Sequence, residues 1–281
     1  MKKYASKTIR YVVASIAFIA LSFISYAIYD SVMYGGTDST DQYVTDADSD
    51  CSVLGINLHG DLYTYIPSTN SEDPTEDSDV VASEEIMGLI EQANDDENIK
   101  GIIVEVDSFG GYPVAGEEVA NAIKASRKPV VAFIRQSGTS AAYWAVITAD
   151  RIFASKNSDI GSIGVTISYL ENVGKNEKDG LSYVQLSAGK YKDAGSPDKP
   201  LTAEEKALII RDLKIIHENF IKEVSENRDI PIEKVRAIAD GSSVLGERAK
   251  ELGLIDEIGG YSEAKSYIEK EIGEKAEICW Q

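Results

Sequence analysis

Histidine, cysteine and positive charge are scarce in this sequence of 281 residues. It has 2 histidines and 2 cysteines, and 28 Lys and Arg face 47 Asp and Glu, which gives a formal net charge of −19. Neither histidine lies in an HExxH motif and no Cys/His cluster occurs, so we expect no metal site and no cofactor. A strongly acidic surface repels phosphate backbones, which argues against nucleic-acid binding.

One long uncharged segment lies near the N-terminus. Residues 11–29 are rich in Ile, Ala, Val and Phe, and as a helix they would span about 28 Å, close to the ~30 Å hydrocarbon thickness of a bilayer. Because basic residues precede this segment and acidic residues follow it, the positive-inside rule places residues 1–10 in the cytoplasm and the rest outside. We expect an uncleaved transmembrane anchor. The alternative is a cleaved signal peptide, with residues 25–27 as its small-x-small site.

The remainder divides into a tether and one domain. Residues 30–50 are polar and acidic, which is typical of a tether, and residues 67–79 are a second acidic stretch that we expect to be an exposed loop. The 43% hydrophobic content suffices for one sizeable domain over residues 51–281. Cys51 and Cys279 lie at the two ends of this domain. In an oxidising compartment they could form a disulfide, and the alternative is two unrelated thiols.

Strand-like and helix-like patterns alternate through the first half of the domain, which predicts an α/β fold with a largely parallel sheet. We expect strands at residues 52–58, 101–106, 129–134 and 151–154, and helices at residues 83–93, 114–125 and 141–149. Beyond Thr202, apolar residues recur at three- and four-residue spacing and predict one amphipathic helix to about residue 227. Thr202 and Glu205 would form its capping box, and a shorter helix is expected at residues 231–239.

A serine and a lysine stand in segments that suit nucleophilic catalysis. Ser140 lies at a predicted strand-to-helix turn, where the next backbone N–H groups can stabilise an oxyanion. Its alternatives are Ser137 and Thr139, and its ordinary role would be a helix N-cap. With only two histidines in the chain, a lysine is the economical base, and Lys192 and Lys190 are the candidates.

A lysine accepts a proton near neutral pH only if burial lowers its pKa by about three units from about 10.4, so we expect the base to be shielded from water. A triad with histidine is not expected. We expect His217 at the edge of the packed face of its helix and His59 at a strand end.

Several separated motifs resemble the signal peptide peptidase A (protease IV) family of membrane-bound serine proteases. The similarity covers roughly residues 51–265 and keeps the family's order. It is carried by residues 102–153, by Gly161-Ser162-Ile163-Gly164, by Lys192-Asp193 with Ser196-Pro197, and by residues 239–257.

The resemblance implies which residues act. The nucleophile is followed by two small residues and an aromatic pair, which selects Ser140, and the base is followed by Asp and then Ser-Pro, which selects Lys192. Gly111 and Ala141 would donate to the oxyanion, and Ser162 would orient the lysine. Ordinary turns are the alternatives for Gly111 and Ser162. The sequence departs from the family at Phe109, which replaces a proline, and at Ala141-Ala142, which replace two glycines and should narrow the pocket.

The resemblance also implies the fold and the activity. We expect a Clp protease/crotonase-like stack of βαβ units with a C-terminal helical extension. The protein would be a membrane-anchored serine endopeptidase with a Ser-Lys dyad and an extracytoplasmic catalytic domain. It would degrade remnant signal peptides and other unfolded or membrane-released peptides. Family members of this length form homo-oligomeric rings, such as octamers, with serine and lysine from neighbouring subunits. The alternatives are a crotonase-type acyl-CoA enzyme and a non-catalytic membrane scaffold of the same fold.

Overall fold

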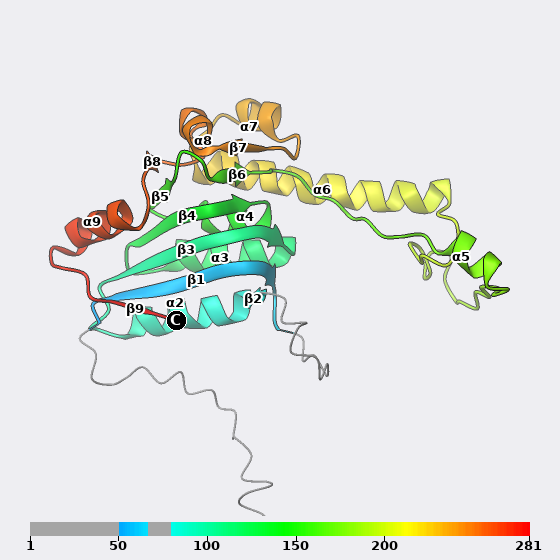
Figure 1. The fold of residues 1–281 in the computed structure, drawn as a ribbon, viewed down its shortest axis with the longest axis horizontal. Helices are drawn as coiled ribbons and strands as arrows, with labels where there is room; N and C mark the ends of the chain where they lie inside the picture. The colour runs from blue at the N-terminus through cyan, green and yellow to red at the C-terminus, as the bar shows by residue number, and fades with distance from the viewer. Residues whose placement is uncertain (1–50, 67–79) are drawn as a thin grey trace, which may run out of the picture. The chain divides into compact units, whose positions relative to one another are not determined.

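A mostly parallel sheet organises residues 51–66 and 80–281, which are the residues that the computed structural model describes (Figure 1). The strands follow the order β2-β1-β3-β4-β5-β8, with β9 beside β1 and β6 between β4 and β7. Every pairing is parallel except that of β6 with β7. The strands are β1 (Val53–Tyr63), β2 (Val80–Ala82), β3 (Gly101–Gly111), β4 (Val130–Thr139), β5 (Arg151–Ala154), β6 (Asp159–Gly161), β7 (Ser243–Leu245), β8 (Glu257–Ile258) and β9 (Ile278–Trp280).

Helices connect these strands and extend the fold after β6. They are α2 (Ser83–Asp95), α3 (Pro113–Ala125), α4 (Ala141–Val146), α5 (Val173–Lys178), α6 (Ala203–Asn227), α7 (Ile232–Ile238), α8 (Gly246–Leu252) and α9 (Tyr261–Ile272). The expected α/β fold with a parallel sheet is confirmed, and each strand and helix predicted within residues 83–239 and at the start of the domain is present. Their ends differ, because β1 and β3 run five residues beyond the predicted ends and α4 stops at Val146.

The sheet is buried on both faces, which explains its nearly continuous apolar strands. Side chains of a strand point alternately to opposite faces. Thus Ile102 and Val104 of β3 join the larger core cluster, which includes buried residues of α2, α3 and α4, whereas Ile103 joins a second cluster with Ala264 and Ile268 of α9. Packing against both clusters therefore holds β3 in place between two layers.

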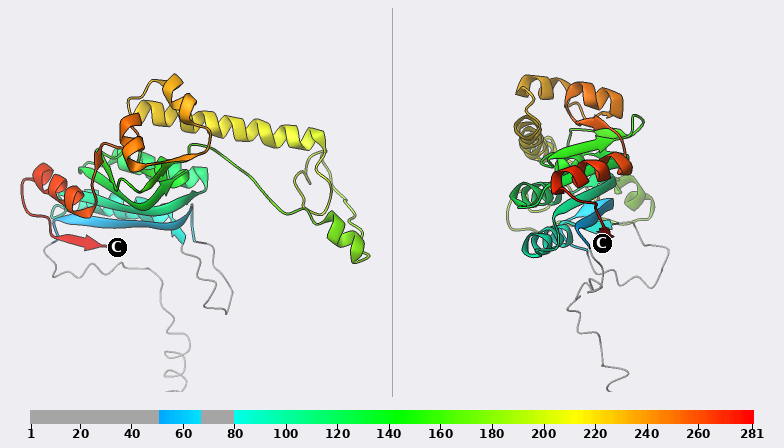
Figure 2. Two further views of the ribbon diagram at one scale, coloured as in Figure 1. Left: turned by 45° about the horizontal axis from the view of Figure 1, so that its top comes forward. Right: turned by 90° about the vertical axis from the view of Figure 1, so that its left-hand side faces the viewer.

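The long helix α6 differs from its prediction in one respect. Its capping box is confirmed, because the Thr202 hydroxyl accepts from the Glu205 N–H at 3.2 Å and the Glu205 carboxylate accepts from the Thr202 N–H at 3.0 Å. The apolar periodicity predicts a packed face along the whole helix, but the buried apolar residues are Phe220, Ile221 and Val224 near its end. The first half of α6 extends past the sheet (Figures 1 and 2), so its apolar side chains have no sheet to cover.

The segment between the sheet and α6 is called the arm here and comprises residues 167–202. It contains α5, which lies apart from the sheet in Figure 1 and in the left view of Figure 2. Eight of its large apolar side chains are exposed, from Tyr191 at 40% to Leu186 at 93%. Such a surface is unusual for a protein that functions as a single chain.

The two ends of the domain are joined. Cys51 and Cys279 form a disulfide with Cα atoms 5.8 Å apart, and β9 pairs with the start of β1. The predicted anchor at 11–29, the tether at 30–50 and the loop at 67–79 lie outside the described residues. Within residues 51–66 and 80–281, no helix is long and apolar enough to cross a bilayer.

Candidate active site

Ser140 occupies the sharp turn between β4 and α4. Its backbone has φ 53° and ψ −127°, a combination that L-residues rarely adopt and that costs on the order of 1–3 kcal/mol. Two backbone hydrogen bonds hold the turn, from the Ser140 N–H to the Gly161 carbonyl at 2.7 Å and from the Trp144 N–H to the Ser140 carbonyl at 3.0 Å. The Ser140 side chain makes no capping hydrogen bond. A strained strand-to-helix turn of this kind presents the nucleophilic serine of α/β-hydrolases.

Two glycines at the end of β3 let its backbone approach this serine closely. Gly110 has φ +121°, and a Cβ added there would lie 2.8 Å from the Cβ of Ser140 and 3.1 Å from the backbone nitrogen of Ala141. Gly111 has φ +154°, and its added Cβ would lie 2.0 Å from the Leu62 carbonyl oxygen. Both positions therefore require glycine, and the predicted oxyanion donor Gly111 lies with Ser140 and Ala141 along one cavity.

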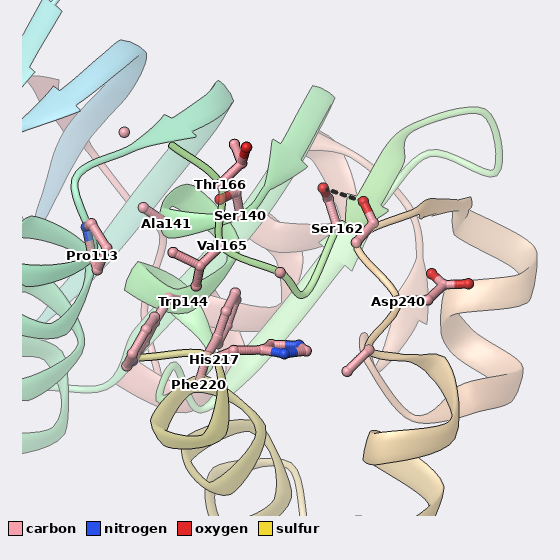
Figure 3. A pocket seen from close by; sticks show the side chains of 14 residues that line it. Pro113, Ser140, Ala141, Trp144, Ser162, Val165, Thr166, His217, Phe220 and Asp240 are labelled. Carbon is pink, nitrogen blue, oxygen red and sulfur yellow. Dashed lines mark hydrogen bonds between the residues drawn. The ribbon is translucent and has the colours of Figure 1, made fainter. Parts of the chain in front are cut away.

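That cavity has a volume of about 500 Å³. Figure 3 shows Trp144 and Phe220 together at its base, on the side of Ser140 and Ala141, and Ser162 and Asp240 across from them. The rings of Trp144 and Phe220 stack with centroids 4.5 Å apart and planes 9° apart, and their exposed fractions are 4% and 1%. The base of the cavity is therefore apolar and rigid.

The far wall is built from a turn and the loop before β7. Ser162 has φ 49° and donates from its hydroxyl to the Gly241 carbonyl at 2.8 Å, the contact drawn in Figure 3. Hydrogen bonds from the Ser242 hydroxyl and backbone N–H hold the pKa of Asp240 below its ordinary value. Pairing of β6 with the end of β4 brings this wall to Ser140.

The two alternative nucleophiles are engaged elsewhere. Ser137 and Thr139 are buried, their hydroxyl oxygens lie 3.3 Å apart, and the Thr139 hydroxyl donates to the Phe109 carbonyl at 3.1 Å. Neither residue lines the cavity, whereas Ser140 does.

The candidate base is not brought to this serine within one chain. Lys192 lies exposed in the arm and does not line the cavity, so the expected shielding from water is not present in a single chain. Its neighbour Lys190 forms an ion pair with Glu204. The hydrogen bond to Glu204, with a further one to Tyr191, raises the pKa of Lys190, which keeps that amine protonated and unsuited to accept a proton.

His217 was expected at the edge of the packed face of its helix and was not predicted to belong to the site. His217 lines the cavity (Figure 3), and its Nε2 is buried without a hydrogen-bond partner among the described residues. The helical spacing of His217 and Phe220 could have indicated a shared face, but not which loop that face meets. The other histidine, His59, lies 3.1 Å from the Glu105 carboxylate, outside the cavity.

The sequence profile of peptidase family S49 matches residues 122–275. The chain belongs to peptidase family S49. The resemblance to the signal peptide peptidase A family is thereby confirmed. A putative protease of Methanocaldococcus jannaschii is 37% identical over 186 residues, which are 66% of this chain and 60% of that protein. A putative signal peptide peptidase SppA of Enterococcus faecium is 25% identical over 245 residues, 86% of this chain and 70% of that protein.

One longer relative and one solved structure are also similar to this chain. Protease 4 of Haemophilus influenzae is 29% identical over 218 residues, 74% of this chain and 34% of that protein. This chain thus spans a third of the length of that relative and 60% of the archaeal one. Among solved structures, a ClpP1 variant from Listeria monocytogenes aligns with a TM-score of 0.46 and 14% identity, over 75% of this chain and 93% of that one.

Proposed function

We propose that this S49 family member is a serine endopeptidase with Ser140 as its nucleophile. The observation that carries the proposal is the strained turn that presents Ser140 beside Gly110 and Gly111 in a cavity with an apolar base. In the acylation step, Ser140 Oγ attacks the scissile carbonyl carbon, the hydroxyl proton passes to the base, and the carbonyl electron pair moves onto oxygen. The C–N bond then breaks as the amine takes the proton, and water releases the acyl group.

The base in this proposal is Lys192 of a second copy. In support, Lys192 is exposed and outside the cavity of its own chain, and Lys190 is held by Glu204. Contact with a neighbouring copy would remove water from the Lys192 amine, which a lysine base requires. The active unit would then be a homo-oligomeric ring of the kind expected from the family.

The remaining roles follow from the cavity walls. The backbone N–H groups of Gly111 and Ala141 would receive the oxyanion, since both residues line the cavity beside Ser140. The Ser162 hydroxyl donates to Gly241, which leaves its oxygen lone pairs to accept from the incoming lysine and orient it.

The substrates would be remnant signal peptides and other unfolded or membrane-released peptides. An apolar cavity base suits apolar side chains, and a domain at residues 51–281, tethered by 30–50 to an anchor at 11–29, would act outside the cytoplasm near the bilayer. The Clp protease/crotonase-like arrangement belongs to this proposal.

Hydrolysis of a model signal peptide by the full chain in detergent tests the nucleophile and the base together. We expect Ser140→Ala and Lys192→Ala to be inactive alone, and we expect activity to return when the two variants are mixed, because mixed rings contain intact pairs. A fluorophosphonate probe should label the parent and fail to label Ser140→Ala. Undiminished hydrolysis by Ser140→Ala would refute Ser140 as the nucleophile. A parent chain that neither hydrolyses peptides nor takes up the probe would favour the acyl-CoA enzyme or the scaffold.

A further inference from the structure

The arm carries an apolar, non-helical stretch whose large side chains the described part of its own chain leaves exposed. Residues 180–189 contain no charged side chain. Within them Leu181, Val184 and Leu186 are 61%, 72% and 93% exposed, and residues 182–187 adopt no helix. An uncharged, non-helical segment with exposed apolar side chains is suited to contact with another chain.

A second exposed apolar surface borders the cavity. It is called the rim here and comprises Tyr65, Ile66, Phe109, Tyr112 and Val114, which are 46–74% exposed. Phe109 and Tyr112 flank Gly110 and Gly111, so the rim begins one residue from the backbone that contacts Ser140. The ring of Tyr112 packs on Tyr63 with centroids 5.0 Å apart, which holds the rim in place.

Chain length relates the two surfaces. Leu186 precedes Lys192 by six residues, which span at most about 22 Å even when fully extended. If the Lys192 amine of one copy reaches Ser140 of another, the distance from Leu186 to that serine can be at most this backbone span plus the length of the lysine side chain. The rim adjoins Ser140 and is an exposed apolar surface within this distance.

Charge favours the same arrangement. The arm contains five acidic and five basic residues, so it contributes nothing to the net charge of −19. Two copies of so acidic a chain repel each other, and a neutral arm can approach the body of a neighbour with the smallest electrostatic cost. The driving force must then come from apolar contact.

We infer that the apolar stretch of the arm, residues 181–187, docks on the rim of a second copy and so delivers Lys192 to Ser140. This inference rests on the proposed function and adds the surfaces through which the copies associate. The rim is thereby an assembly surface as well as the edge of the cavity.

Association of the full chain in detergent tests the docking, and the Ser140→Ala background prevents self-cleavage. We expect Leu186→Asp and Phe109→Lys each to weaken association, measured by sedimentation velocity, at least about tenfold. The double variant should regain association, since the new charges oppose each other. Ile215→Asp on α6, at a side chain 54% exposed and outside both surfaces, is the matched control and should assemble as the parent does.

Three results would overturn the docking. They are unchanged assembly of either single variant, equal dissociation by the Ile215→Asp control, and failure of the double variant to regain association. Unchanged assembly in detergent together with weaker flotation on liposomes of Leu186→Asp would show that a bilayer covers the arm instead. Restored hydrolysis on mixing Ser140→Ala with Lys192→Ala, combined with intact assembly of Leu186→Asp, would leave the dyad standing and refute only the docking surface.

Discussion

The buried aromatic stack at the base of the cavity predicts how much stability the protein loses when Phe220 is truncated. Phe220 is 1% exposed and stacks on Trp144 at 4.5 Å, so it joins α6 to α4, the helix that begins at Ser140. Truncation of a buried phenylalanine costs about 3–5 kcal/mol, so Phe220→Ala should lower the melting temperature by about 6–20 °C at 2–4 °C per kcal/mol. The widened cavity should also shift cleavage toward larger apolar side chains.

Intrinsic fluorescence measures this change directly, because the chain has 2 tryptophans. In a Trp280→Phe background the signal comes from Trp144, whose emission should move to longer wavelength when Phe220 is removed. Ile215→Ala truncates a side chain of the same helix that is 54% exposed and lies outside the rim and the arm, so it should alter the stability by no more than about 0.5 kcal/mol. A loss below about 1 kcal/mol for Phe220→Ala, with unchanged Trp144 emission, would refute the buried stack.

Three further changes have expected outcomes. Gly110→Ala places a methyl group 2.8 Å from the Cβ of Ser140 at a residue with φ +121°, so kcat/KM for peptide hydrolysis should fall about 100-fold or more. The control is Gly273→Ala, at a glycine with positive φ and open space around it. Equal losses of kcat/KM in the two variants would contradict the steric reason. Replacing Cys51 and Cys279 by Ala opens a loop with a sequence separation of 228 and should cost up to about 5 kcal/mol in urea unfolding; identical midpoints with and without reductant would disprove a stabilising disulfide. The pKa of Glu205 is lowered from 4.5 to about 2, mainly by the side-chain hydrogen bond from Lys199. The ionised Glu205 therefore stabilises the fold above pH 4.5, and this stabilisation is lost as the pH falls toward 2. Glu205→Gln should flatten the plot of unfolding free energy against pH in this range, and a plot parallel to that of the parent would count against this assignment.

Local patterns predicted the parts of the fold that local physics determines. Short apolar runs identified β1 and β3, and the Thr202 and Glu205 pair marked the start of α6. Strand ends were missed because glycines in long strands look like turns, and Gly110 and Gly111 continue β3 to its contact with Ser140. β9 was not predicted, since a three-residue strand is defined by its pairing with β1 and carries little pattern of its own.

The parts of the site formed by residues that are neighbours in sequence could be predicted. The parts formed by contacts between distant segments could not. The turn at Ser140 was evident from small residues between a strand and a helix. The place of His217 in the cavity wall depends on the loop at Ala239–Gly241 folding back against α6, a long-range contact that no spacing within α6 reports. Lys192 is exposed in the single chain, so the prediction of a shielded amine is not met there, and only the proposed assembly could supply such surroundings.

The two alanines after the nucleophile show how the structure refines a family comparison. Both were expected to narrow the pocket, because the family usually has glycine at each position. Ala141 lines the cavity, so its methyl does occupy space beside Ser140. Ala142 is fully buried in the core cluster and does not line the cavity, so its methyl adds packing and helix propensity instead. Any restriction of the substrate side chain by this departure must therefore come from Ala141 alone.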